Sequence, residues 1–442
     1  MSRFWVETLG CPKNAVDSDK VVASLQADGL VAADALGDAD LVVVNTCAFV
    51  EAARQESIDT ILTLAEARKP GARLVATGCL AERSGAELAA ALPELDAVVG
   101  FADEGSIATE SLALAMPRRK PTGVRDLLEL PRAPEPVARG GVPWAYVKVA
   151  EGCDRACAFC AIPSFRGRQR SRTPEAILAE AATLVDAGVV ELVLVAQDLA
   201  WYGRDAGEPG ALAPLLRRLD AQLAPRGLRR IRLLYLYPSE VHDPLVSTML
   251  ELDTVVPYFD LSLQHADRGL LRRMRRWGSG DRFAEMIASI RERAPEAAFR
   301  SSFIVGFPGE TEAAHDALLT FLAKVELDWA GFFPFSREDG TTAADLDREV
   351  PAPLIAEWLR ECDEVQVPIT AAARDALVRE SATVEVLVDT PGVGRTHREA
   401  PETDGVVHLV DGAGLEAEVA PGTLVRAQVT GALGPDLVAV VG

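Results

Sequence analysis

Short apolar runs alternate with helix-length periodic segments along most of the chain. In residues 1–115, three such runs end at Cys11, Cys47 and Cys79, and each precedes a stretch whose apolar residues recur every three or four positions. Strands that alternate with amphipathic helices are typical of βαβ units and a parallel sheet. We therefore predict a parallel α/β domain, with a fourth strand at residues 95–100.

This alternation stops between Met116 and Trp144. Six prolines fall in that interval, and proline interrupts both helices and strand pairing. We predict that residues 1–118 form the first domain and that residues 119–140 form a linker.

The alternation resumes at Trp144 and continues to a helix predicted at residues 355–378. Each apolar run but the last is followed by a helix candidate. The six predicted strands are residues 144–150, 190–198, 231–238, 258–264, 298–308 and 328–335. Both a six-stranded (βα) partial barrel and an open doubly wound sheet fit this order, and in either fold ligands bind at the carboxyl ends of the strands. This second domain is predicted to span residues 141–378.

Beyond Ser381 the chain is predicted to contain strands without helices. Glycine, proline and aspartate separate short apolar runs at residues 382–390, 405–410, 423–432 and 437–442. Residues 379–442 are therefore predicted to form a small OB-like β-barrel.

Composition limits the class of protein. No apolar run approaches the roughly 20 residues of a membrane helix, and the N-terminus has no signal-peptide pattern. We expect a cytoplasmic protein with no membrane partner, in which thiols stay reduced. The formal net charge of −21 argues against a general nucleic-acid binder.

Three of the seven cysteines lie on one short segment, where Cys153, Cys157 and Cys160 have the spacing C-x3-C-x2-C. A structural zinc site uses four ligands, and no histidine lies nearby. An iron–sulfur cluster fits better, because its irons prefer thiolates. With three thiolates, a 4Fe–4S cluster keeps one iron without a protein ligand. Such an open coordination position is usually where a metal site reacts.

A second set consists of Cys11, Cys47 and Cys79, each at the end of its own predicted strand. Parallel strands place their carboxyl ends along one edge, so these three thiols are expected to converge into another three-thiolate site. Cys362 lies alone in a predicted helix and is interpreted as structural.

The cysteine loop, with Phe159 before its last cysteine and its place after the first strand of a partial barrel, resembles the radical SAM superfamily. The resemblance implies that S-adenosylmethionine binds the open iron. The string FIVGFPGET resembles the strand that lies beside the adenine in that family. The residues implied to bind S-adenosylmethionine are Phe159, Gln197, Gln264, Gly306 and Gly309. The alternative interpretation is that the glycines are ordinary turn residues and the glutamines are ordinary polar residues at strand ends.

Two three-cysteine sets, a radical SAM barrel and a β-barrel tail similar to a TRAM domain together resemble the radical SAM methylthiotransferases over nearly the whole chain. The strings LGCPKNAVDSD, IPSFRGR and LQHAD are closest to the RimO subfamily. The resemblance implies two 4Fe–4S clusters, S-adenosylmethionine and an external electron donor. The implied reaction places a methylthio group on the β-carbon of an aspartate in small-subunit ribosomal protein twelve, free or in the subunit. No side chain is assigned a catalytic role, because the hard chemistry belongs to the cofactors.

Charge patterning adds two expectations about partners. Residues 381–442 hold nine acidic and three basic residues, so the tail is expected to dock a basic ribosomal protein rather than bind nucleic acid sequence-specifically. Arginines are suited to the carboxylate of the substrate or of S-adenosylmethionine. The candidates are Arg166, Arg168, Arg170, Arg172, Arg272, Arg273, Arg275 and Arg276.

Three alternatives remain open on sequence alone. They are a tRNA adenosine methylthiotransferase, a non-catalytic iron–sulfur electron carrier and a zinc-stabilised binding protein.

Overall fold

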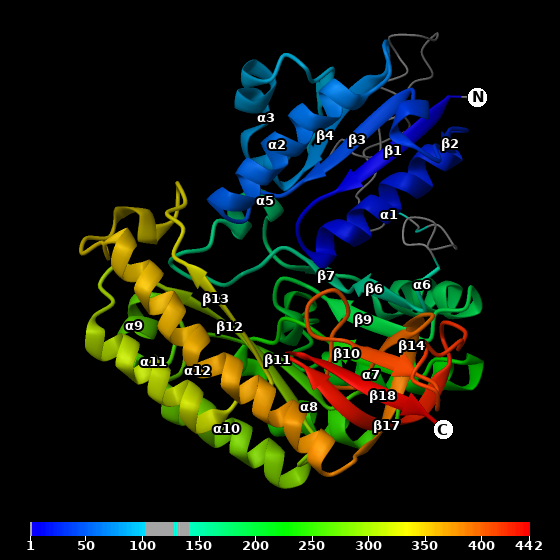
Figure 1. Cartoon of the computed structure of the whole chain (residues 1–442). Helices are drawn as coiled ribbons and strands as arrows, with labels where there is room; N and C mark the ends of the chain where they lie inside the picture. The colour runs from blue at the N-terminus through cyan, green and yellow to red at the C-terminus, as the bar shows by residue number, and fades with distance from the viewer. Residues whose placement is uncertain (1, 102–127, 129, 131, 133–140) are drawn as a thin grey trace.

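The computed structural model describes residues 2–101, 128, 130, 132 and 141–442 (Figure 1). The predicted linker at 119–140 lies outside the described residues except for Leu128, Leu130 and Arg132. Two of these three residues contact the first helix of the chain: Lys20 donates to the carbonyl of Leu128 over 2.8 Å, and Arg132 pairs with Asp19.

A five-stranded parallel sheet with strand order β2-β1-β3-β4-β5 forms the N-terminal part of the molecule. Its strands are β1 (Arg3–Thr8), β2 (Val31–Ala32), β3 (Leu41–Thr46), β4 (Arg73–Gly78) and β5 (Ala97–Val98), and its helices are α1 (Pro12–Ala27), α2 (Glu51–Ala67) and α3 (Cys79–Ala91). All six residues of β3 are buried, as expected for a central parallel strand covered on both faces. The four predicted strands are present, and the two-residue β2 is an addition.

Six parallel strands form the central part. One sheet has the order β10-β9-β6 and the next β11-β12-β13, and bridges from Ile231 to Val255 and from Leu236 to Leu261 join them. The strand order therefore follows the sequence, whereas a doubly wound sheet reverses its order at a switch point. Of the two architectures that the sequence left open, the structure has the partial barrel.

The elements of this part alternate as the sequence predicts. The strands are β6 (Trp144–Lys148), β9 (Glu191–Val195), β10 (Arg230–Leu233), β11 (Tyr258–Gln264), β12 (Ala298–Val305) and β13 (Trp329–Pro334). The helices are α5 (Ile162–Arg166), α6 (Pro174–Asp186), α7 (Leu212–Leu223), α8 (Asp243–Glu251), α9 (Arg268–Arg273), α10 (Gly280–Arg293), α11 (Glu312–Val325) and α12 (Ala352–Arg379). Cys362 lies in α12 and is completely buried in the core.

The C-terminal part is a closed barrel with the order β14-β15-β16-β18-β17. Its strands are β14 (Thr383–Thr390), β15 (Val393–Arg395), β16 (Val407–Val410), β17 (Leu424–Leu433) and β18 (Asp436–Val441). The three-residue β15 was not predicted. No helix among the described residues is long and apolar enough to cross a membrane.

Buried ion pairs attach this barrel to the central part. Glu191 of β9 accepts from Arg232 and from Arg395, each over 2.8 Å, and all three side chains are at most 2 % exposed. In the tail, Glu399 pairs with Arg374 and Asp404 with Arg300. The acidic residues of the tail thus divide into some that hold the barrel in place and others, on its surface, that remain available to a partner.

Replacing Glu191 with glutamine is expected to lower the free energy of unfolding by about 3 kcal/mol at neutral pH. Burial alone would raise the pKa of Glu191, but Arg395, Arg232 and Arg230 lower it from 4.5 to about 2. The stabilisation is therefore present above pH 4.5 and is lost as the pH falls from 4.5 towards 2. Denaturant unfolding of both forms checks this: their difference should be constant from pH 7 to 5 and shrink below pH 4.5. A constant difference at all pH values would contradict the assignment.

Candidate functional site

The first set of thiols lies on the loop at the carboxyl edge of the barrel, after β6. A two-stranded hairpin of β7 (Ala150–Glu151) and β8 (Arg170–Ser171) closes this loop. The amide of Cys153 donates to the carbonyl of Gly167 over 3.1 Å. At Gly152, whose φ is +77°, a Cβ atom would lie 2.2 Å from the carbonyl oxygen of Arg168. Only glycine lets the two sides of the loop approach so closely.

The second set lies at the carboxyl edge of the N-terminal sheet, where topology predicted that it would converge. Cys11 is the residue before α1, Cys47 follows β3, and Cys79 is the first residue of α3. A Cβ atom on Gly10 would lie 2.8 Å from the sulfur of Cys47, so the loops after β1 and β3 are in direct contact. The amide of Cys47 also donates to Ser57 over 3.0 Å.

Burial keeps most of these thiols protonated in the absence of a bound cation. Burial raises the pKa of Cys79 and of Cys160 to about 12, and that of Cys153 to about 11. Burial also acts to raise the pKa of Cys11, but Lys13 and Arg166 outweigh it, and the pKa is lowered. Thiols of this kind ionise when a metal coordinates them.

Both sets consist of cysteines alone, and thiolates are the ligands of iron–sulfur clusters. All seven cysteines are free thiols. Within each set the thiols are close enough to perturb one another's pKa electrostatically. Yet among the described residues no three His, Cys, Asp or Glu side chains are grouped as ligands of one metal ion. In a 4Fe–4S cluster each thiolate binds a different iron, so three free thiols from one set can serve as ligands of such a cluster.

A buried charged network connects the two sets. Arg166 of α5 donates to Asp17 of α1 over 2.8 Å and to Glu151 over 2.9 Å. Lys148 pairs with the same two carboxylates, with 2.6 Å to Glu151. The other guanidinium nitrogen of Arg166 lies 3.1 Å from the sulfur of Cys79. Arg166 and Lys148 outweigh the effect of burial and lower the pKa of Glu151. The network fixes the N-terminal sheet against the barrel beside both thiol sets.

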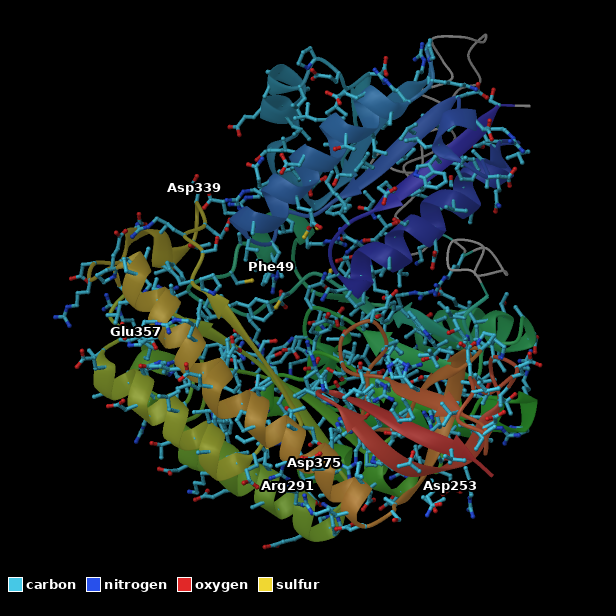
Figure 2. The ribbon with its side chains drawn as sticks, viewed as in Figure 1. Phe49, Asp253, Arg291, Asp339, Glu357 and Asp375 are labelled. Carbon is cyan, nitrogen blue, oxygen red and sulfur yellow. The ribbon has the colours of Figure 1, made fainter. Side chains whose placement is uncertain are left out.

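A second contact joins the two parts at the end of β13. Glu338 is 2 % exposed and pairs with Arg54 of α2 and with Arg83 of α3, the latter over 2.6 Å. Arg83 also donates to the carbonyl of Asp339. Figure 2 shows Asp339 and Phe49 on this side of the junction. Phe49 is half exposed and lies two residues after Cys47, so an apolar side chain is accessible next to the second thiol set.

The residues predicted to contact S-adenosylmethionine are in part already engaged in contacts within the protein. Gln197 donates to Glu151 over 2.6 Å, and its carbonyl oxygen is buried without a partner. Gln264 adopts a φ of +74° at a bulge in β11, which is unusual for a residue with a side chain. Phe159 packs against the barrel core. These three residues lie at the carboxyl edge of the barrel.

The two glycines have a structural reason to be glycine. Both have positive φ values, +84° at Gly306 and +90° at Gly309. A Cβ atom would lie 2.4 Å from Ile355 at the first and 2.8 Å from Arg273 at the second. Close packing against these side chains thus accounts for both positions, and contact with a ligand remains a prediction.

Sequence reasoning missed two polar groups near the site. Gln169 is 4 % exposed, and neither atom of its amide group has a partner. Glu310 accepts from the amide of Gly306 and lies 3.1 Å from His265 of the LQHAD string, which is completely buried. Burial and pairing of such residues leave no periodic signal in a sequence.

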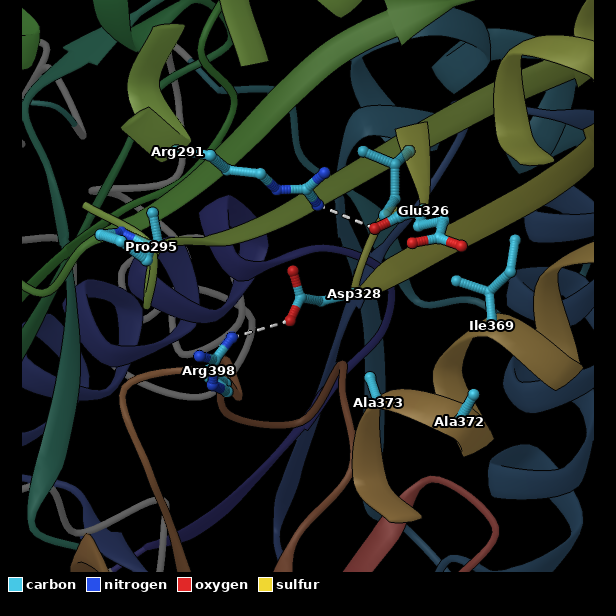
Figure 3. A pocket seen from close by; sticks show the side chains of 10 residues that line it. Arg291, Pro295, Glu326, Asp328, Ile369, Ala372, Ala373 and Arg398 are labelled. Carbon is cyan, nitrogen blue, oxygen red and sulfur yellow. Dashed lines mark hydrogen bonds and ion pairs between the residues drawn. The ribbon is translucent and has the colours of Figure 1, made fainter. Parts of the chain in front are cut away.

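A cavity of about 310 Å³ lies at the opposite end of the barrel (Figure 3). Its lining includes Ala297 and Asp328, which directly precede β12 and β13. Arg398 pairs with Asp328, and Arg291 donates to the carbonyl of Glu326. Because it lies at the amino ends of the strands, this cavity is separate from the two thiol sets.

Comparisons with family models divide the chain into three matches. Residues 3–100 match a model described as uncharacterized protein family UPF0004, residues 147–322 match the radical SAM superfamily, and residues 382–441 match the TRAM domain. The first two matches contain one thiol set each.

Curated relatives match over nearly the full chain. The ribosomal protein uS12 methylthiotransferase RimO of Salinispora tropica is 44 % identical, with 98 % of this chain and 94 % of the relative covered. The RimO protein of Kineococcus radiotolerans is 40 % identical, with 98 % of this chain and 96 % of the relative covered. That of Streptomyces coelicolor is 41 % identical, with 98 % of this chain and 95 % of the relative covered.

Among solved structures, the radical S-adenosylmethionine methyltransferase TsrM of Kitasatospora setae has a similar fold. One of its structures aligns with a TM-score of 0.55 at 14 % identity, over 78 % of this chain and 74 % of that one.

Proposed function

The chain belongs to the RimO family of ribosomal protein uS12 methylthiotransferases, and we propose that it installs a methylthio group on the β-carbon of an aspartate of uS12. The observation that carries this function is the pair of three-thiol sets at two facing carboxyl edges, connected by the buried network around Arg166. One site starts the reaction on the substrate, and the other holds the sulfur.

The residues present fit the cofactors of the family. Cys153, Cys157 and Cys160 would hold one 4Fe–4S cluster with its open iron towards S-adenosylmethionine, and the second thiol set would hold the other cluster. When bound, these groups supply the one-electron chemistry that breaks an unactivated C–H bond, together with the sulfur and the methyl group.

The protein's own contribution is placement and exclusion of water. Arg166 and Lys148 fix the distance between the two sites through Asp17 and Glu151. The buried, unpartnered carbonyl oxygen of Gln197 is a candidate acceptor for the ammonium of S-adenosylmethionine. Phe159 would support the cluster loop from the core side.

The substrate also suggests where the enzyme acts. A ribosomal protein is made and assembled in the cytoplasm, so we propose a cytoplasmic enzyme that receives electrons from an external donor. Sequence-specific binding to nucleic acid is not part of the proposal, because the chain carries a net charge of −21.

Charge reversal on the tail is expected to weaken uS12 binding. Glu416 and Glu418 are exposed, so the double variant Glu416→Lys/Glu418→Lys should raise the Kd for uS12 about tenfold at low salt. The effect should diminish as the salt concentration rises. The matched control is Glu357→Lys on α12, which is exposed on another face (Figure 2). Equal binding by both variants at low salt would contradict tail docking.

Mass spectrometry of a deletion strain tests the proposed function. Loss of the methylthio group from uS12, restored by the gene on a plasmid, is expected, with methylthioadenosines of tRNA unchanged. Loss from tRNA with uS12 unaffected would favour the tRNA enzyme instead. An unchanged pattern in both would be expected of an electron carrier.

A further inference from the structure

Lys13 is a buried residue whose ammonium makes no hydrogen bond or ion pair among the described residues and instead lies over the ring of Tyr235. Lys13 is 9 % exposed. The other buried lysines and arginines of the described ranges all make hydrogen bonds or ion pairs. Lys20, for example, donates to Leu128, and Lys148 pairs with Asp17. The Nζ atom of Lys13 is not one of the fully buried polar atoms without a partner, so the ammonium keeps contact with solvent. It acts electrostatically on the nearby Cys11 thiol. An anion that enters between the two thiol sets can therefore reach this cation and form a charge-assisted hydrogen bond with it.

The position of Lys13 is between the two thiol sets. It is the second residue of α1 and follows Cys11 by two positions. Its ammonium lies 3.5 Å from the ring centroid of Tyr235, just beyond the carboxyl end of β10. The first turn of α1 adds the partial positive charge of a helix N-terminus. An anion at this place would lie between the edge of the N-terminal sheet and the edge of the barrel.

Tyr235 is held in a strained backbone conformation that supports this position. Its φ is +65°, which is rare for a bulky residue and must be imposed by its surroundings. Its amide donates to Asp260 over 2.9 Å, and its carbonyl accepts from the amide of Leu199 over 3.1 Å. These contacts hold the ring of Tyr235 in place, and its face attracts the Lys13 ammonium through a cation–π interaction.

The arginines that sequence suggested for a carboxylate are otherwise engaged or exposed. Arg166 is paired with Asp17 and Glu151, and Arg172 pairs with Glu180 over 2.8 Å. Arg276 lies 3.4 Å from the sulfur of Cys157. Arg168 has a side chain that is 90 % exposed.

We propose that Lys13, positioned by Tyr235, binds the carboxylate of the substrate aspartate. This inference rests on the proposed function, because an aspartate supplies the anion. A carboxylate bound here would present the adjacent β-carbon in the space between the two sites. Lys13 would then determine specificity for aspartate over asparagine at the modified position.

A double-mutant cycle on the holoenzyme tests this inference. The Kd of labelled uS12 is measured anaerobically, with aspartate or asparagine at the modified position, for the full chain carrying both clusters. In the wild type, asparagine should raise the Kd at least about tenfold. In Lys13→Gln the two substrates should bind equally, and Lys13→Arg should restore the preference. Lys20→Gln removes another buried cation from the same helix and should keep the full preference.

Two further readouts separate the possible failures. An unchanged aspartate preference in Lys13→Gln overturns the inference. If that variant also shifted the electron paramagnetic resonance spectrum or the potential of the second cluster, Lys13 would serve the cluster instead. The wild type reports on the proposed function separately: if it adds no methylthio group to uS12, that function fails. Iron content and circular dichroism verify that each variant is folded and loaded.

Discussion

Replacing Cys157 with alanine will abolish the formation of 5′-deoxyadenosine from S-adenosylmethionine, whereas replacing Cys79 with alanine will leave it largely intact. Cys157 belongs to the set on the barrel loop and Cys79 to the set on the N-terminal sheet. We expect a loss of more than about 100-fold in the first variant, because removing a thiolate disrupts the cluster that S-adenosylmethionine must bind. Both variants should lose methylthio transfer to uS12.

Iron analysis accompanies these assays. The wild type should contain about eight irons per chain, and each variant about four. Cys362→Ser is the control, because Cys362 is buried in α12 and belongs to neither set, so this variant should keep all the iron and both activities. Retention of 5′-deoxyadenosine formation by the Cys157 variant would refute the assignment of the first set.

The second large effect is expected at Arg166. Arg166→Met removes the cation shared by Asp17 and Glu151 and leaves two buried carboxylates with Lys148 alone. Breaking a buried pair from one side costs about 3–5 kcal/mol. The thermal unfolding midpoint should fall, and because Arg166 also lies 3.1 Å from the sulfur of Cys79, the second cluster should be lost more readily.

Thermal unfolding and timed release of iron to a chelator measure both effects. Arg168→Met is the matched control, because its side chain lies two residues away but is 90 % exposed. It should change the midpoint little. If both variants unfolded at the same temperature and released iron at the same rate, the network would not hold the two sites together.

The sequence predicts the architecture well where burial imposes a period. Strands such as β3 are buried on both faces and appear as continuous apolar runs. The two-residue β2, the hairpin of β7 and β8 and the three-residue β15 are too short to show a pattern. The convergence of Cys11, Cys47 and Cys79 was predictable, because parallel topology alone brings strand ends to one edge.

The electrostatic part of the site was not predictable from the sequence. Lys148 and Asp17 are separated by 131 positions in the chain, and charged residues in helices and loops normally face solvent. The same limit applied to the arginines, since Arg166 and Arg168 are only two positions apart in sequence but one is buried and the other exposed. Lys13 likewise stands out only when its position over the ring of Tyr235, without a hydrogen bond or ion pair among the described residues, is seen in three dimensions.

The most direct test of the account is methylthio transfer by the purified enzyme with both clusters reconstituted. Intact uS12, S-adenosylmethionine, a sulfide source and a strong reductant are combined without oxygen, and the products are analysed by tandem mass spectrometry. We predict a gain of one methylthio group on a single aspartate, together with 5′-deoxyadenosine, and no transfer with Cys79→Ala. Formation of 5′-deoxyadenosine without any modification of uS12, or modification of tRNA in its place, would contradict the central claim.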